Sequence, residues 1–216
     1  MRRIDIARPE RVAPTRRRVL PRHSAAIMLL AALPGCVPPA AIPGVAPPPT
    51  SATLTPTAVD PARIAPDATI GQSVAATPGL STLAAEVRAA GLGTMLDGPG
   101  PYTLFAPSDA AYARLAPGVA QDLLAPDNRA TLALLLRNHA VAGEVDVAAL
   151  TQRIEAGGGR ATLTTLAGQP ITATLTDGVV TLTSSSGEKA YVEAADIRQA
   201  NGLLQVINGV LTPTLP

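Results

Sequence analysis

The chain has 216 residues, with 17 Lys and Arg, 16 Asp and Glu, and a formal net charge of +1. Residues 1–35 hold eight Arg and two acidic residues, so the remainder has 9 basic and 14 acidic residues and a net charge of −5. Aromatic residues make up 2% of the sequence. This composition argues against a nucleic-acid-binding protein, because it lacks a basic surface and aromatic side chains on which bases stack.

The first 35 residues have the layout of an export signal. An Arg-rich segment precedes the apolar run 25–33, which suits the core of a signal peptide. The run is too short to cross a bilayer, which needs about 20 apolar residues. Residues 15–20 (TRRRVL) resemble the twin-arginine signal, but a generic basic segment explains them as well, so twin-arginine and Sec export both remain open.

The apolar run ends in the sequence LPGC at residues 33–36, which resembles a bacterial lipobox. In a lipobox the Cys becomes the first mature residue and is acylated, with palmitate among its acyl chains. We therefore expect lipidation of Cys36, which is the only Cys in the chain, and no internal disulfide. The alternative, a buried thiol, suits Cys36 poorly because a Pro-rich segment follows it. Val37 in place of Asp favours the outer membrane, by analogy with lipoprotein sorting.

Residues 36–66 are expected to form a lipidated Cys and a tether. Nine prolines are mixed with Ala, Thr and Ser between residues 37 and 66, and no apolar periodicity is present. Such a composition favours extended chain and cannot build a core. We therefore expect a lipid-anchored protein of the cell envelope, with its domain facing the periplasm or the exterior.

Residues 67–216 are expected to fold as one α+β domain, with most helices before the strands. Apolar spacing predicts helices near 70–77, 81–90, 119–124, 128–138 and 147–154. In the helix at 128–138, Leu132, Leu135 and Leu136, followed by His139, are expected to form one core-facing stripe. Alternation of Thr with apolar residues and short apolar runs predict strands near 102–105, 140–141, 161–166, 171–176, 179–183, 190–192, 203–207 and 210–211. Asp177-Gly178 is expected to form a two-residue hairpin turn between two of them.

Helix caps are predicted from the polar residues that precede the periodic segments. Ser81 or Thr82 is expected to cap the helix that ends at Gly91, and Asp127 the helix that begins at residue 128. Ser108 is expected to cap a helix directly after the strand at 102–105, because Pro107 disfavours helix before it.

Three segments, 98–115, 134–143 and 195–211, resemble the fasciclin (FAS1) domain family in the family's own order. The first contains GPYTLFAPSDAAY, the second LLRNHAVAG, and the third ADIRQANGLLQVINGVL. Gln205 departs from the family pattern, which frequently has His there, and Pro213 stands one place late. The resemblance implies a compact α+β fold in which several helices flank a wedge-like antiparallel β-sandwich.

One group of residues has the types needed for hydrolysis: Ser108, Asp109 and His139. A catalytic triad is recognised by its geometry, however, and residue types alone do not supply it. Asp109 begins a helix and His139 ends a core-facing one, so we expect a buried, hydrogen-bonded structural pair, as the resemblance also implies. No catalytic residue, metal ligand set or cofactor is predicted.

The resemblance implies a non-catalytic adhesion or interaction module whose partner is an envelope or extracellular protein or a glycan. In animal relatives, the positions matching His139, Asp196 and Ile197 have been implicated in receptor binding. From the residues themselves we expect Glu193, Arg198 and Gln199 to form an exposed patch on a loop, supported by buried Ile197. Asp196 is alternatively a turn cap.

Two other functions remain open. One is an envelope lipoprotein that carries a small molecule or lipid, and the other is an accessory subunit of an envelope enzyme. An apolar pocket with converging polar groups favours a carrier or an enzyme. A domain without a pocket but with a contiguous surface patch favours adhesion.

Overall fold

The computed structural model describes residues 58–214, so the predicted signal, Cys36 and most of the tether lie outside the described residues. The folded unit begins earlier than residue 67. Val59 packs against the core, the short 3-10 helix η1 (Pro61–Arg63) follows, and Ile64 is buried. The predicted boundary is therefore too late, because the last residues assigned to the tether contribute apolar side chains to the core.

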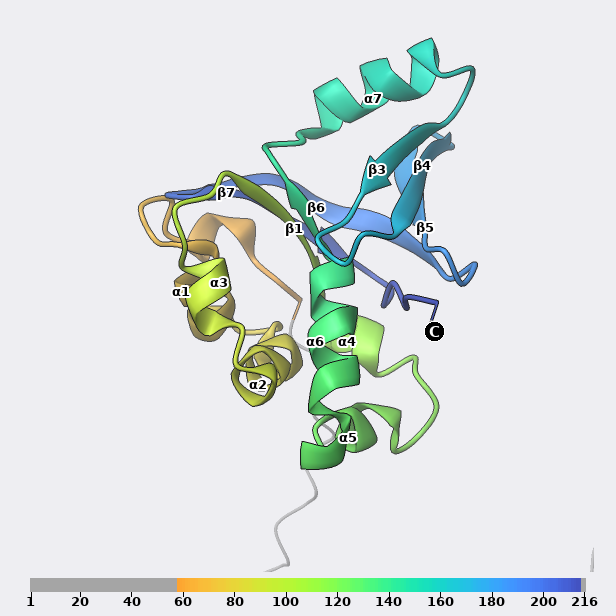
Figure 1. Cartoon of the computed structure of the whole chain (residues 1–216). Helices are drawn as coiled ribbons and strands as arrows, with labels where there is room; N and C mark the ends of the chain where they lie inside the picture. The colour runs from red at the N-terminus through yellow and green to blue at the C-terminus, as the bar shows by residue number, and fades with distance from the viewer. Residues whose placement is uncertain (1–57, 215–216) are drawn as a thin grey trace, which may run out of the picture. The chain divides into compact units, whose positions relative to one another are not determined.

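Seven strands form one curled sheet in the described part of the chain, in the order β2-β1-β7-β6-β5-β4-β3 (Figure 1). An isolated bridge between Val141 and Thr165 joins its two ends, so the sheet is nearly closed. The strands β1 and β7 pair in parallel, and all other neighbouring strands pair antiparallel. The prediction of a wholly antiparallel sandwich was therefore wrong. The strands are β1 (Tyr102–Pro107), β2 (Ala140–Ala142), β3 (Ala161–Thr164), β4 (Pro170–Thr176), β5 (Val179–Thr183), β6 (Lys189–Gln199) and β7 (Gly202–Ile207).

Helices α1 to α6 gather on one side of the β1–β7–β6 part of the sheet, and α7 lies on the other (Figure 1). Among the described helices, none combines the length and the apolar character that crossing a membrane requires. The helices are α1 (Ile70–Ala76), α2 (Ser81–Ala90), α3 (Gly93–Leu96), α4 (Asp109–Tyr112), α5 (Val119–Leu123), η2 (Pro126–Asn128), α6 (Arg129–Asn138) and α7 (Val147–Ala156).

Two hydrophobic clusters occupy the two sides of this sheet, because alternate residues of β1 and β7 point in opposite directions. Leu104 and Val206 belong to the cluster under the helices α1 to α6, whereas Phe105 and Ile207 belong to the cluster under α7. The predicted stripe on α6 is confirmed and joins the first cluster, with Leu132, Leu135 and Leu136 buried.

The predicted caps are partly confirmed. The Ser108 hydroxyl accepts a hydrogen bond from the backbone N–H of Ala111 and caps α4. Asp127 lies inside η2, and α6 begins after Asn128 without a side-chain cap, so the predicted cap at Asp127 was wrong. Ser81 is the first residue of α2 and does not cap it, because a carboxylate from α4 does so instead.

Asn201 ties together three elements that the sequence keeps far apart. Its side-chain oxygen accepts the backbone N–H of Ile70, at the start of α1, at 2.9 Å. Its amide donates to the carbonyl oxygens of Leu96 and Gly98 at 2.8 Å each. Gly202 follows with φ +147°, where a Cβ would overlap the carbonyl of Tyr102 on the neighbouring strand. The Asn201-Gly202 dipeptide is therefore a structural joint of the fold.

Candidate functional site

His139 is a buried structural residue, with 1% of its surface exposed. Its Nε2 accepts the backbone N–H of Leu211 at 2.9 Å, and its Nδ1 lies 2.8 Å from the carbonyl oxygen of Leu135. Burial lowers the pKa of His139 to about 4, although the Leu135 carbonyl favours the charged form. The imidazole is therefore neutral near pH 7 and cannot touch a partner.

Asp109 forms its hydrogen bonds with the start of α2 and not with His139. One carboxylate oxygen accepts the backbone N–H and hydroxyl of Ser81 at 3.2 and 2.8 Å, and the other accepts the N–H of Thr82 at 2.8 Å. Burial raises the pKa of Asp109, but the hydrogen bonds from Thr82 and Ser81 outweigh it and hold the pKa below its ordinary value of 3.8. The predicted Asp109–His139 pair was wrong, because both ring nitrogens of His139 already have backbone partners.

The three residue types of a hydrolytic triad are likewise not assembled. The Ser108 hydroxyl lies 3.4 Å from a carboxylate oxygen of Glu193 and also caps α4. Since His139 bonds to Leu135 and Leu211, no described contact makes it a base for Ser108. Within residues 58–214, His, Cys, Asp and Glu side chains also form no group of three or more able to hold a metal ion.

Asp196 was expected in a loop between strands, but it lies within β6, where the pairing of the strand is irregular. The pairing of β6 with β7 shifts between Val192 and Ala194 and again between Ala194 and Ile197. Asp196 has φ +56°, in the left-handed region that Asp tolerates better than most residues. Such bulges re-aim side chains and are frequent at functional sites.

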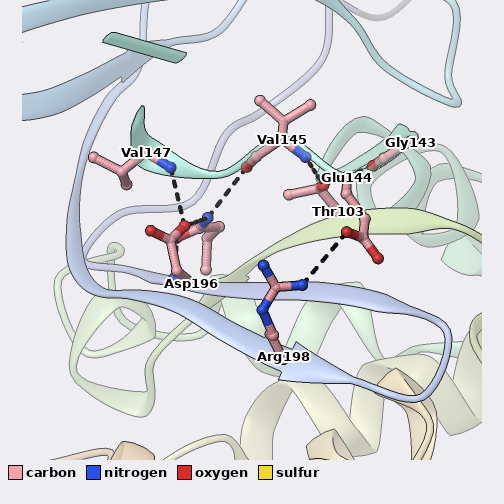
Figure 2. A network of polar contacts seen from close by, with 8 residues as sticks. Thr103, Gly143, Glu144, Val145, Val147, Asp196 and Arg198 are labelled. Carbon is pink, nitrogen blue, oxygen red and sulfur yellow. Dashed lines mark hydrogen bonds and ion pairs between the residues drawn. The ribbon is translucent and has the colours of Figure 1, made fainter. Parts of the chain in front are cut away.

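The segment at residues 143–147, here called the crossing loop, runs from β2 over the neighbouring strands and ends at the first residue of α7. On β1, the Thr103 hydroxyl donates to the carbonyl oxygen of Gly143 at 2.7 Å and accepts the N–H of Val145 at 2.8 Å. Figure 2 shows these contacts together with the next ones along the loop. Thr103 thus fixes the first half of the crossing loop on the sheet.

The second half of the crossing loop is fixed by β7 and β6 (Figure 2). The amide of Gln205 donates to the carbonyl oxygen of Val145 at 3.2 Å and to the Asp196 carboxylate at 2.7 Å. The Gln205 side-chain oxygen accepts the N–H of Asp196 at 2.9 Å, and the Asp196 carboxylate accepts the N–H of Val147 at 3.0 Å. Gln205, which replaces the frequent His of the resembling family, therefore couples the bulge to the crossing loop.

An exposed ion pair completes this neighbourhood. Arg198 on β6 lies 3.7 Å from Glu144 of the crossing loop, and their side chains are 71% and 48% exposed. An exposed pair of this kind adds about 0–1 kcal/mol to stability, so the fold does not depend on it. We call the exposed residues Glu144, Asp196 and Arg198 the bulge surface.

The predicted patch is only partly present as one surface. Ile197 is buried beneath it, as expected, but Gln199 is also buried and contacts Ser73 of α1, so its predicted exposure was wrong. Glu193 is exposed but lies beside Ser108 and, with Val59, lines a hollow of about 410 Å³. Glu193 therefore lies near the end of β7, whereas Arg198 pairs with Leu203 near its start, so Glu193 is not part of the bulge surface.

A buried carboxyl was missed altogether. Glu86 on α2 is 0% exposed, and the Tyr112 hydroxyl donates to its Oε2 at 2.6 Å. Burial raises the pKa of Glu86 to about 7, and the bond from Tyr112 opposes this rise only in part. Burial and the Glu86 charge together raise the pKa of Tyr112 well above 10. The position of Glu86 between Leu83 and Ala90 on the helix was a signal that could have found it.

One larger hollow lies between α2, α4 and α5, with a volume of about 710 Å³. Its wall combines apolar side chains with the polar Ser81, Thr82, Asp109 and Tyr112. An apolar hollow of about 160 Å³ lies between α5, α6 and the C-terminal residues, and it is smaller than typical ligand pockets.

A sequence model of the Fasciclin domain matches residues 78–213 of the chain. Protein sll1483 of Synechocystis sp. is 35% identical over 147 residues, which cover 68% of this chain and 74% of that protein. The uncharacterized protein sll1735 of the same organism is 36% identical over 131 residues, covering 61% of this chain and 87% of that protein. Human Stabilin-1 is 31% identical over 149 residues but is matched over 5% of its length.

Among solved structures, the FAS1 domain pair of the insect cell adhesion molecule Fasciclin I is similar, with a TM-score of 0.60 and 19% identity. The match covers 70% of this chain and 52% of that structure, so the chain spans about half of the domain pair. At this identity, the likeness is evidence for the fold alone.

Proposed function

The chain belongs to the fasciclin domain family, and we propose that it is a membrane-tethered extracytoplasmic interaction module that binds its partner through the bulge surface. Fasciclin domains are modules associated with adhesion and interaction, and they are generally non-catalytic.

One observation carries the proposed location: exposed charges stand on a rigidly supported bulge. Asp196 and Glu144 project from backbone that Thr103 and Gln205 fix across three strands. Preorganised side chains lose less conformational entropy when they bind, so such a surface favours recognition. The position of Asp196-Ile197 also matches the pair implicated in receptor binding in animal relatives, although Ile197 itself is buried.

The proposed tether consists of the lipidated Cys36 and the Pro-rich segment that follows it. Two acyl signals hold a protein stably at a membrane where one does not. An extended segment of roughly 3 Å per residue would hold the domain tens of ångströms from the lipid. In this proposal the tether presents the bulge surface to an envelope or extracellular protein or glycan.

Photo-crosslinking in native cells tests the location. A photo-reactive amino acid placed at Glu144 is expected to give a light-dependent adduct with one partner. The same residue placed at Arg88, which is exposed on α2, is the matched control and is expected to give none. Equal adducts at both positions, or an adduct at Arg88 alone, would contradict the proposed surface.

A small-molecule carrier is the second candidate, and the hollow of about 710 Å³ favours it because its volume lies in the range of ligand pockets. Asp109 supplies a carboxylate at its wall. Purification of the chain from native membranes followed by mass spectrometry under native conditions is the test. A bound small molecule in equal amount to the protein would support the carrier.

A further inference from the structure

One face of the β3–β4–β5 part of the sheet is lined by threonines. Alternate positions on the three strands are Thr, and antiparallel pairing places them on the same side. The pairs include Thr162 with Thr172, Thr172 with Thr183, and Thr174 with Thr181. We call this the threonine face; its members are Thr162, Thr164, Thr172, Thr174, Thr176, Thr181 and Thr183.

The opposite face of the same strands is the one that packs into the core. Leu163, Ile171 and Leu182 are buried there against Leu150 and Ile154 of α7. The threonine face is exposed at its rim and covered near its centre: Thr162, Thr164 and Thr176 are exposed, Thr172, Thr174 and Thr183 are half-buried, and Thr181 is 3% exposed. Six of the seven threonines are therefore at least partly accessible to a ligand, while the opposite face packs into the core.

Spacing and rigidity make the threonine face a regular array. Neighbouring strands lie about 4.8 Å apart, and alternate residues along one strand are about 6.8 Å apart. Thr is β-branched, so its hydroxyl and methyl groups are held in few rotamers. The buried Thr181 hydroxyl donates to that of Thr176 at 2.9 Å and so helps to orient this exposed hydroxyl. A ligand with repeated hydroxyl groups would meet donors and acceptors already in place.

The border of the face adds an aromatic side chain. Tyr191 pairs with Thr181 in register and is 40% exposed. One paired position on this face is charged: Lys189, which lies opposite Thr183 at the start of β6. An uncharged, hydroxyl-rich face complements an uncharged ligand, because a charged one would lose hydration without gaining a counter-charge.

We propose that the threonine face binds an extended neutral polysaccharide, with Tyr191 stacking on a sugar ring and the threonine hydroxyls bonding to the sugar hydroxyls. A sugar ring has apolar C–H faces and a polar rim, so it matches the mixed methyl and hydroxyl character of this face. This site is separate from the bulge surface and does not depend on the function proposed for it.

The test is retention of the processed chain, purified in detergent, on crystalline cellulose and on an insoluble β-1,3-glucan. The triple variant Thr172→Val, Thr174→Val, Thr183→Val keeps side-chain shape and strand preference but removes three hydroxyls. It is expected to bind at least ten-fold more weakly. Tyr191→Ala is expected to weaken binding, and Tyr191→Phe to preserve it.

Two controls separate this site from other causes. Thr151→Val removes a hydroxyl from α7 and is expected to bind like the wild type, as is Arg198→Glu on the bulge surface. Thermal melting of every variant within a few degrees of the wild type confirms that the fold is kept. Loss of binding in Arg198→Glu would transfer the polysaccharide site to the bulge surface and overturn this proposal.

Two further results would overturn it. One is no retention of the wild type on either polysaccharide, or equal retention of the triple valine variant. The other is binding to ice in place of polysaccharide, because the ordered surface of ice also suits an array of hydroxyl and methyl groups. Inhibition of ice recrystallisation that the triple variant loses, without retention on polysaccharide, would assign the face to ice.

Discussion

The hydroxyl of Tyr112 donates a hydrogen bond to Oε2 of Glu86 at 2.6 Å, and Oε1 of the same carboxyl is buried without a partner among the described residues. An unpartnered buried oxygen disfavours the ionised carboxylate, which is the physical reason for the raised pKa of Glu86. The pair connects α2 to α4 inside the first hydrophobic cluster.

The pKa of Glu86 predicts that its contribution to stability falls as pH rises. The ordinary pKa of 4.5 rises to about 7 on folding, so the folded state holds more protons than the unfolded state between these values. The contribution is full below pH 4.5 and is lost through pH 7, by roughly 3 kcal/mol at most. Urea unfolding at a series of pH values should show this contribution as the difference in slope between the wild type and Glu86→Gln.

The pKa of His139 predicts the opposite slope. Its ordinary value of 6.5 falls to about 4 on folding, so the unfolded state holds more protons between these values. Stability from this residue is full above pH 6.5 and is lost as pH falls towards 4. In the wild type, the two slopes oppose each other between about pH 4.5 and 6.5. The same titration should therefore show stability rising with pH in Glu86→Gln and falling with pH in His139→Gln; parallel curves would contradict both assignments.

The cap that Asp109 supplies to α2 predicts a local loss of stability. Asp109→Ala removes the acceptor for two backbone N–H groups at the start of α2, and it should lower the free energy of unfolding by about 1–3 kcal/mol. Ser81→Ala removes one donor and leaves both backbone bonds, so it is the matched control and should cost less. Urea denaturation measures both, and equal losses would show that the cap is not the cause.

Local sequence patterns predicted much of the fold because local rules decide those parts. The stripe on α6 follows from apolar spacing, and Asp177-Gly178 forms the predicted hairpin turn, with positive φ at both residues. Ser108 caps α4 because its acceptor lies three residues away. Each of these features is set by neighbours within about one turn of chain, so the sequence alone contains the needed information.

Features set by distant neighbours were not predicted. Asp109 was matched with His139, but its partners are Ser81 and Thr82, on a helix that precedes it by 27–28 residues. The bulges in β6 depend on pairing with β7 and on the crossing loop, so the strand was expected to be shorter and Asp196 was expected in a loop. The parallel pairing of β1 with β7 likewise joins segments about 100 residues apart.

Lipidation at Cys36 stays a prediction, because this residue lies outside the described residues. Cys36→Ser should move the chain from the detergent phase to the aqueous phase when native membranes are partitioned in a phase-separating detergent. The cause would be loss of the acyl chains that hold the protein at the membrane. Unchanged partitioning of the variant would remove the lipid anchor from the account.

Recognition through the bulge surface is the central claim, and a charge exchange between Glu144 and Arg198 tests it most directly. Arg198→Glu alone breaks the ion pair and presents a reversed charge. The double variant Glu144→Arg, Arg198→Glu restores an ion pair with its two charges exchanged. Neither change should lower the free energy of unfolding by more than about 1 kcal/mol, because the pair is exposed.

The measurement is the affinity of these variants for the partner identified by crosslinking. Both the single and the exchanged variant are expected to bind at least ten-fold more weakly than the wild type, because charges on the partner complement the position of each charge on the bulge surface. Wild-type affinity in the single variant would contradict the claim outright. Recovery of affinity in the exchanged variant would also contradict it, because the pair would then act only through the structure of the loop.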